Sequence, residues 1–169
     1  MKRPTGEIYS EMFRIGFGFD THPLVPGRPF WLGGIQIPSE KGAAGHSDAD
    51  VLIHAICDAL LGAAGLRDIG NQFPDTDPAY HQIDSKILMT KTYEMISSKG
   101  LTITNIDSTV VLQNPKIGEY IPTMVTTLSE LLDIDQDQIS IKAKTSEKLG
   151  FIGREEGVSA YAVALLQLG

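Results

Sequence analysis

Two short stretches of the sequence carry imidazole and carboxylate groups at spacings that suit a metal ion. Asp20 and His22 stand two residues apart in "FRIGFGFDTH", and an extended chain directs such positions to the same side. His54 lies in "GHSDADVLIHAICDALLGAAG", which has the pattern of a helix. Two imidazoles and one carboxylate are the ligand set of a catalytic zinc ion that keeps a fourth position open. The sequence therefore predicts a zinc site at Asp20, His22 and His54.

The same helix also permits a less specific interpretation. Asp50, His54 and Asp58 recur at every fourth residue and so share one face. A polar stripe of this kind is commonly a solvated surface. If His54 binds a metal, Asp50 and Asp58 are candidates for orienting the ligands, because a metal-bound imidazole usually donates its second N–H.

Two loops carry polar groups that suit phosphate or a second cation. Lys144, Thr145 and Glu147 follow an alternating segment in "AKTSEKLGF", where hydroxyl, amide and ammonium groups can hold phosphate and the carboxylate can hold Mg²⁺. The "FPDTDP" loop, residues 73–78, places two aspartates in a turn. Turn capping, or a strand end entering solvent, accounts for the same residues.

The elements that must position these groups alternate between strands and helices. Residues 13–22 predict a strand that runs into a loop, and 30–38 a pair of short strands bent at Gly33 and Gly34. Residues 39–45 predict a mobile loop. A helix follows from about Asp48 to Ala64, with Ser47 as N-cap and Gly65 as its end.

The second half of the chain continues the alternation, after a loop rich in Gly, Pro and Asp. Helices are predicted from Asp84 or Ser85 to Ser98, and within 115–134 with Pro122 in the first turn. Strands are predicted at 101–114, at 138–146 and at 157–168, where a helix is the alternative. The fold class is therefore α+β, a mixed four-stranded sheet with helices on one face.

Composition narrows the class of protein. The chain has 169 residues and a formal net charge of −7, which argues against a nucleic acid partner. Its one cysteine, Cys57, excludes a disulfide within the chain, and no apolar run predicts a membrane span or a secretory signal. We expect a cytoplasmic protein with a loose extension at 1–12 and a single catalytic domain at 13–169.

Six segments of the sequence match a known family in the family's own order. They are "RIGFGFDTH", "LGGIQIP", "GHSDADVLIHAICDALLGAAGLRDIG", "FPDTDP", "QNPKI" and "IKAKTSEKLGFIGREEG". The chain resembles the 2-C-methyl-D-erythritol 2,4-cyclodiphosphate synthases from Phe13 almost to its C-terminus. The resemblance implies a chorismate-mutase-like or ferredoxin-like fold, and a homotrimer with active sites between subunits.

The resemblance also implies roles for individual residues. One zinc ion per chain would bind Asp20, His22 and His54, and Mg²⁺ or Mn²⁺ would bind Glu147. The implied catalytic residues are His46, beside the methylerythritol phosphate, and Thr145, beside the diphosphate. The residues implied to bind other parts of the substrate are Ser47, Asp68, Gly70, Asp75, Pro115, Lys116, Ile117, Lys144, Phe151 and Arg154.

The implied reaction is an intramolecular phosphoryl transfer of the non-mevalonate isoprenoid pathway. In a cytidine diphosphate ester of methylerythritol 2-phosphate, the 2-phosphate attacks the β-phosphorus, CMP leaves and a cyclic diphosphate forms. The residues alone leave three alternatives open. These are a zinc-dependent hydrolase of a small phosphoester, a trimeric nucleotide-binding protein without turnover, and a structural domain with a solvated helix face.

Overall fold

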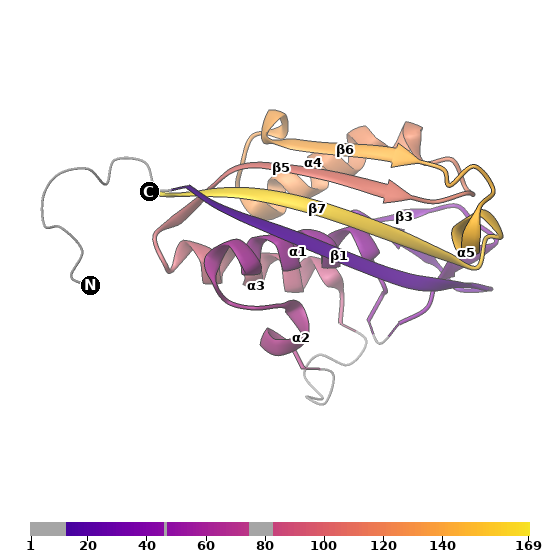
Figure 1. The fold of residues 1–169 in the computed structure, drawn as a ribbon, viewed down its shortest axis with the longest axis horizontal. Helices are drawn as coiled ribbons and strands as arrows, with labels where there is room; N and C mark the ends of the chain where they lie inside the picture. Colours follow the sequence, from indigo (N-terminus) through magenta and orange to yellow (C-terminus); the bar gives the residue numbers. More distant parts are fainter. Residues whose placement is uncertain (1–12, 46, 75–82) are drawn as a thin grey trace, which may run out of the picture.

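A curled five-stranded mixed sheet lies at the centre of the computed structural model, which describes residues 13–45, 47–74 and 83–169 (Figure 1). The strand order is β4-β1-β7-β5-β6, and only the β5–β6 pair is parallel. The strands are β1 (Phe13–Pro26), β4 (Lys41–Ala43), β5 (Leu101–Val111), β6 (Ile139–Lys144) and β7 (Gly157–Leu168).

The α+β class is confirmed, and the sheet differs from the prediction in two respects. It has a fifth strand, β4, in the segment that was predicted to be a mobile loop. This strand pairs with the last three residues of β1, so β1 runs past His22 to Pro26. Asp20 and His22 therefore lie within a strand, and their pairing with Ala160 and Val158 of β7 fixes their direction.

The segment at 157–168 forms strand β7, as predicted, at the middle of the sheet. It pairs with β1 on one side and β5 on the other, and Val158, Ala160, Ala162 and Ala164 are buried. A strand bonded on both edges and covered on one face favours β-branched and small apolar residues. This position decides between the strand and the helix that the sequence alone permitted.

Helix α1 (Val51–Ala64) lies against β1 and β7 at unusually close range. A Cβ atom built on Gly16 would stand 1.9 Å from the Ala59 carbonyl oxygen, and one on Gly18 would stand 1.9 Å from that of Ala55. The helix backbone thus occupies the space of the missing side chains. Even-numbered residues of β1 face the helix, and odd-numbered residues face away.

The start of α1 differs from the prediction of Ser47 as N-cap. Asp50 is the N-cap, and its Oδ1 accepts a hydrogen bond of 3.0 Å from the Ile53 amide. Ala49 has a φ of 59°, so the chain before Asp50 cannot continue the helix. The Ser47 hydroxyl instead accepts from the Ala49 amide at 3.0 Å, in a local turn.

Two further long helices complete the layer on the helical side of the sheet (Figure 1). As predicted, α3 (Ser85–Ser97) is capped by Asp84, and α4 (Ile121–Leu132) carries Pro122 in its first turn. The predicted hairpin forms from β2 (Phe30–Leu32) and β3 (Ile35–Ile37). The 3₁₀ turn Gly118–Tyr120 lies within the segment 115–134 that predicts a helix. The short helices not predicted are α2 (Ile69–Gln72), α5 (Gly150–Gly153) and the 3₁₀ turn Gln136–Gln138.

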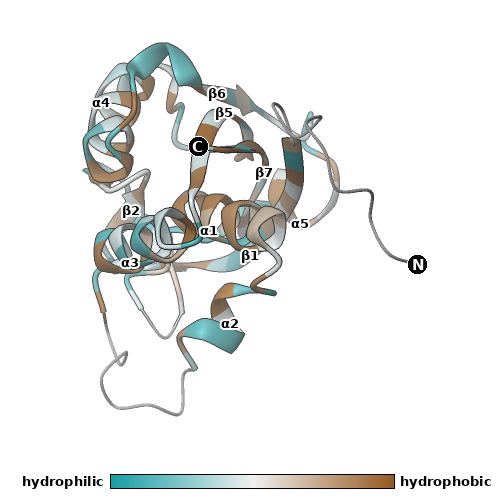
Figure 2. Cartoon of the chain, turned by 90° about the vertical axis from the view of Figure 1, so that its left-hand side faces the viewer, coloured by the Kyte–Doolittle hydropathy of each residue, from teal (hydrophilic) through white to brown (hydrophobic). Residues whose placement is uncertain are grey.

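Burial follows this layering. Figure 2 shows hydrophobic residues concentrated along α1 and hydrophilic residues along α2. The odd-numbered side of β1 is different, because its large apolar side chains are exposed; Ile15 is 73% exposed and Phe17 is 65% exposed. Phe13, Phe19, Tyr161 and Val163 extend this apolar face across β1 and β7. Among the described residues, no helix is long and apolar enough to cross a membrane.

Candidate metal centre and substrate site

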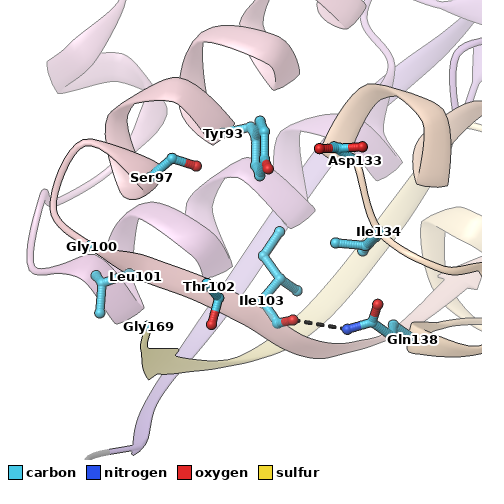
Figure 3. A pocket seen from close by; sticks show the side chains of 10 residues that line it. All are labelled: Tyr93, Ser97, Gly100, Leu101, Thr102, Ile103, Asp133, Ile134, Gln138 and Gly169. Carbon is cyan, nitrogen blue, oxygen red and sulfur yellow. Dashed lines mark hydrogen bonds between the residues drawn. The ribbon is translucent and has the colours of Figure 1, made fainter.

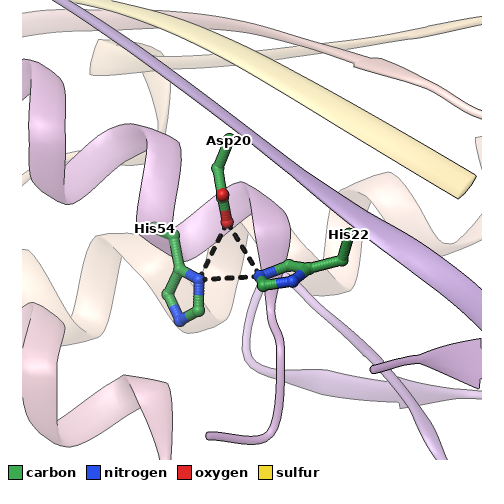
Figure 4. Close-up of side chains that lie close together, drawn as sticks. All are labelled: Asp20, His22 and His54. Carbon is green, nitrogen blue, oxygen red and sulfur yellow. Dashed lines mark hydrogen bonds and ion pairs between the residues drawn. The ribbon is translucent and has the colours of Figure 1, made fainter. Parts of the chain in front are cut away.

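Strand β1 and helix α1 bring Asp20, His22 and His54 to one point, as predicted (Figure 4). The Asp20 Oδ2 atom lies 3.0 Å from His22 Nε2 and 2.9 Å from His54 Nδ1. The two ring nitrogens are 3.2 Å apart. Both β1 residues are on the even-numbered side, which continues from Gly16 and Gly18 toward α1. The close approach of strand and helix thus sets His54 opposite Asp20.

The geometry of the three donor atoms fits a small divalent ion. Zinc–ligand bonds are about 2.0–2.1 Å for nitrogen and oxygen, so neighbouring ligands of a tetrahedral zinc are separated by about 3.3 Å. The donor atoms are separated by 2.9 to 3.2 Å. Their side chains are 25%, 17% and 12% exposed for Asp20, His22 and His54, so solvent still reaches the group. The set is therefore a candidate metal centre with one side open.

The charges within this group reinforce each other. Burial raises the pKa of Asp20, but hydrogen bonds and charge from His22 and His54 outweigh it, so this pKa lies well below its usual range. Burial lowers the pKa of His54, and the contact with Asp20 outweighs it, so this pKa is raised. Asp20 is thus an anion at any physiological pH, as a metal ligand must be.

The second nitrogen of His54 faces two hydroxyls. Its Nε2 lies 2.9 Å from Ser85 Oγ and 3.3 Å from Ser47 Oγ. Ser85 in turn donates its hydroxyl proton to Asp48. The sequence does not predict Ser85 and Asp48 as neighbours of the site, because only tertiary packing brings the start of α3 to the loop before α1.

The carboxylates of Asp50 and Asp58 differ from the predicted orienting role. Asp50 is fully buried and accepts from the amides of Gly33, Gly34 and Ile53. Burial raises the pKa of Asp50, and these three amides stabilise its anion. Asp58 accepts from the Ile69 amide at 2.8 Å. Among the described residues, no side-chain hydrogen bond joins Asp50 or Asp58 to His54, so both carboxylates organise backbone.

The Asp58 contact joins α1 to the segment of Asp68 and Gly70. Asp68 caps the short helix α2 by accepting from the Asn71 amide at 2.8 Å, and Gly70 lies in that helix. Asp58 stands one turn after His54, so it fixes this segment beside the metal centre. The segment was predicted to be a loop, and the two capping carboxylates account for the helical turn.

A second group of predicted site residues gathers at the ends of β5 and β6. These strands are parallel, so their carboxyl ends meet at the same edge of the sheet. Thr145 donates to the Glu147 carboxylate at 2.6 Å, immediately after Lys144 ends β6. The Lys148 amide donates to the Gln113 side chain at 3.2 Å, which ties this loop to the one after β5.

The other predicted substrate contacts lie in the same two loops and in α5. The loop after β5 holds Pro115, preceded by a cis peptide bond, and Lys116, which donates to the Gln113 carbonyl at 3.3 Å. Ile117 is buried, so this residue presents backbone rather than side chain. Phe151 is 45% exposed, and Arg154 pairs with Glu156 at the surface.

The predicted site residues that the structure describes form two separate groups. No hydrogen bond among them joins the Asp20, His22 and His54 group to the loops after β5 and β6. Ser47, predicted to contact the methylerythritol phosphate, lies beside His54 of the metal centre. His46 and Asp75, also predicted for this site, lie outside the described residues.

A cavity of about 460 Å³ lies elsewhere, near the other end of the sheet (Figure 3). Tyr93, Ile103 and Gln138 are among its lining residues, and the Gln138 side chain donates to the Ile103 carbonyl at 2.9 Å. None of the described predicted site residues lines it. The cavity does not contribute to the candidate site.

A curled mixed sheet, one helical layer and an Asp-His-His group at their junction define an α+β protein with a candidate divalent-metal centre. The model of the YgbB family matches residues 13–167. The chain belongs to this family, and its resemblance to the cyclodiphosphate synthases is confirmed.

Curated relatives support this assignment. The 2-C-methyl-D-erythritol 2,4-cyclodiphosphate synthase of Bacteroides fragilis is 61% identical over 153 residues, which are 90% of this chain and 96% of the relative. The synthase of the same name from Porphyromonas gingivalis is 58% identical over 154 residues, or 91% of this chain and 95% of the relative.

Solved structures agree with the fold. A CDP-bound 2C-methyl-D-erythritol-2,4-cyclodiphosphate synthase is 41% identical, with a TM-score of 0.84 over 90% of this chain and 99% of that chain. The bifunctional IspDF of Campylobacter jejuni is 41% identical with a TM-score of 0.91, over 95% of this chain and 43% of that chain. This chain thus spans less than half of the bifunctional protein.

Proposed function

We propose that the chain is a 2-C-methyl-D-erythritol 2,4-cyclodiphosphate synthase, a phosphorus–oxygen lyase of isoprenoid biosynthesis. It converts 4-diphosphocytidyl-2-C-methyl-D-erythritol 2-phosphate to the cyclic diphosphate and CMP. The observation that carries the proposal is the convergence of Asp20, His22 and His54 on one point. The names of relatives with 58–61% identity identify the reaction. They do not favour the alternative of a phosphoester hydrolase.

The reaction requires one anion to approach another. When bound at Asp20, His22 and His54, a zinc ion supplies positive charge to a phosphate oxygen and makes the phosphorus more electrophilic. Glu147 would hold Mg²⁺ or Mn²⁺ together with substrate phosphates, since Mg²⁺ sites commonly use one carboxylate plus phosphate oxygens. The hydroxyl of Thr145 and the ammonium group of Lys144 would bind the diphosphate.

Ring closure also requires a flexible substrate to be held at both ends. The Ser47 hydroxyl beside His54 would bind the methylerythritol phosphate, together with His46 and Asp75. Asp68 and Gly70 would contact the ribose, and the backbone of residues 115–117 the cytosine. Such positioning can lower a barrier by about 7–11 kcal/mol. The nucleophile is a phosphate oxygen that is already anionic near neutral pH, so these residues bind and orient rather than remove a proton.

We also propose that residues 13–169 act as one catalytic domain within a homotrimer. The support is the apolar face of β1 and β7, where Phe13, Ile15, Phe17, Phe19, Tyr161 and Val163 are 38–73% exposed. Contiguous exposed apolar side chains of this size mark an interaction surface. An active site completed by a neighbouring subunit agrees with the separation of the two residue groups. The cytoplasmic location stays a prediction.

One incubation tests the activity. The full chain with zinc, Mg²⁺ and the cytidylylated substrate should release CMP and the cyclic diphosphate, which ³¹P NMR distinguishes from free phosphate. Free phosphate would instead identify a hydrolase, and an unchanged substrate would identify a binding protein. Asp20→Asn should bind less than one zinc per chain and lower the rate by about 100-fold or more, because several kcal/mol of charge stabilisation are lost.

A further inference from the structure

The environment of His54 Nε2 assigns a role to two residues outside the predicted ligands. Ser85 is fully buried at the first position of α3, and its Oγ stands 2.9 Å from His54 Nε2. Both oxygens of Asp48 are directed at Ser85; Oδ2 accepts from the Ser85 amide at 2.9 Å, and Oδ1 accepts from the hydroxyl. The three side chains therefore form a chain of hydrogen bonds from His54 to a carboxylate.

The direction of these hydrogen bonds follows from the chemistry of the groups. An ionised carboxylate only accepts, so the single hydroxyl proton of Ser85 is directed to Asp48. The lone pair of Ser85 Oγ is then what faces His54, and Nε2 must carry the proton that is shared with it. Nδ1 is left as the nitrogen that faces Asp20 and His22 at 2.9 and 3.2 Å.

Ser47 does not alter this direction. Its hydroxyl lies 3.3 Å from His54 Nε2, farther than that of Ser85, and it already accepts from the Ala49 amide. A hydroxyl can serve as donor or acceptor, so Ser47 accommodates a protonated Nε2. The hydrogen bond from Ser85 to Asp48 is therefore what requires a proton on His54 Nε2.

We propose that Ser85 and Asp48 are positioning residues, which hold the proton of His54 on Nε2 and so present Nδ1 as the metal ligand. The inference rests on the proposed zinc centre and deepens it. It links the N-terminus of α3 to the metal through a hydroxyl, which differs from the direct carboxylate contacts predicted for Asp50 and Asp58. Outer partners of this kind typically contribute 10–100-fold to metal affinity.

The tautomer can be measured without any substitution. In the zinc-bound full chain with ¹⁵N-labelled histidine, long-range ¹H–¹⁵N correlations should place the His54 proton on Nε2. A proton on Nδ1 overturns the inference. Because this measurement uses the natural chain, it determines the tautomer of His54 even if a variant fails to fold.

Two variants test the contribution of the positioning residues. Ser85→Ala should weaken zinc binding about 10-fold or more in competition with a chelator. Asp48→Asn should weaken it in the same direction, because an amide group replaces one of the two acceptors that hold Ser85. Ser129→Ala removes another buried helix hydroxyl, which bonds to Thr126, and should change zinc affinity less than twofold.

The outcomes separate this inference from the proposed function. Zinc affinity of Ser85→Ala within twofold of the natural chain, with cyclic diphosphate still formed, overturns the positioning role and leaves the synthase assignment intact. A natural chain that takes up no zinc overturns both the metal centre and this inference.

Discussion

Competition between a proton and the proposed zinc ion at His54 would give the site a pH dependence with a definite sign. Because the pKa of His54 is raised above its ordinary value of 6.5 by Asp20, the protonated pair stabilises the metal-free fold. This contribution is complete below pH 6.5 and is lost as the pH rises through the folded-state pKa. Zinc requires the neutral ring, so its affinity changes in the opposite direction.

We therefore expect the metal-free chain to lose stability from pH 6 to pH 9, while zinc affinity increases. Urea unfolding of the metal-free chain and chelator competition, each across this range, measure the two trends. His54→Gln provides the control, since it should remove most of the pH dependence of unfolding. A metal-free stability that rises with pH would contradict the assignment of the pair.

A second residue, Asp50, illustrates a carboxylate that supports backbone. It is fully buried and accepts from three amides, those of Gly33, Gly34 and Ile53. In Asp50→Asn, an amide group must face at least one of these N–H donors. We expect a loss of about 2–4 kcal/mol in the free energy of unfolding, from a helix cap and charge-assisted hydrogen bonds.

The midpoint of urea unfolding measures this loss. Asp107→Asn is the matched control, because Asp107 forms an exposed pair with Lys142 at 2.5 Å, and exposed pairs contribute about 0–1 kcal/mol. Equal effects of the two substitutions would show that the buried contacts of Asp50 have no special weight.

These residues also show which contacts between side chains could be predicted from the sequence. The spacing of Asp20 and His22 predicts that both point the same way, and a helical His54 needs only one tertiary contact to join them. The partners of Asp50 lie 16 and 17 residues earlier in a hairpin turn, and Ser85 lies 37 residues after Asp48. No local pattern encodes such pairs, so the helix face alone could not predict these partners of Asp50.

At the scale of elements, the packing of β1 against α1 determines whether the metal centre can form. A methyl group at Gly18 would stand 1.9 Å from the Ala55 carbonyl, and neither backbone can move without breaking its hydrogen bonds. We expect Gly18→Ala to cost about 3 kcal/mol or more. Zinc affinity should fall as well, because the added methyl group would displace α1 and so move His54 away from Asp20.

Gly62→Ala is the contrasting substitution on the same helix. Gly62 is exposed, and a Cβ atom there would meet nothing within 4 Å. Replacing glycine by alanine within a helix stabilises it by about 0.5–1 kcal/mol, so a small increase in the thermal midpoint is expected. Destabilisation by both variants to the same degree would refute the close-approach argument.

The long elements and the hairpin of β2 and β3 at Gly33 and Gly34 could be predicted from the sequence, and the other short elements could not. Alternation and capping residues identify α1, α3, α4 and the four long strands, because each has a pattern over many residues. Strand β4 has three residues, and α2 and α5 have four each. Elements of this length depend on single contacts, such as the Asp58 carboxylate on the Ile69 amide, that have no periodic pattern.

At the scale of the whole molecule, the apolar face of β1 and β7 predicts assembly. Ile15→Asp puts a charge where a neighbouring subunit would exclude water, so we expect sedimentation to show monomers in place of trimers. Turnover should fall with the trimer if active sites lie between subunits. Ile87→Asp, at an exposed isoleucine on α3, should leave the assembly unchanged. A natural chain that sediments as a monomer would contradict the proposed trimer.

The fold class could be predicted because the order of strands and helices constrains it, whereas the assembly came from the resemblance. A pattern of exposed large apolar residues is visible only once their direction in the sheet is known. The alternation of Ile15, Phe17 and Phe19 with Gly16 and Gly18 carries that information, but it does not say which side is covered.

Strand β1 thus contributes alternate residues to two surfaces. The number of residues along the strand is therefore more tightly constrained than the residue types. Inserting or deleting one residue between Phe13 and Asp20 would exchange the two sides. The aromatic rings would then be directed into the helix backbone, or the carboxylate would turn toward the exposed apolar face. A single substitution on β1 alters one of these surfaces, whereas a frame change of one position would disrupt the metal centre and the apolar face together.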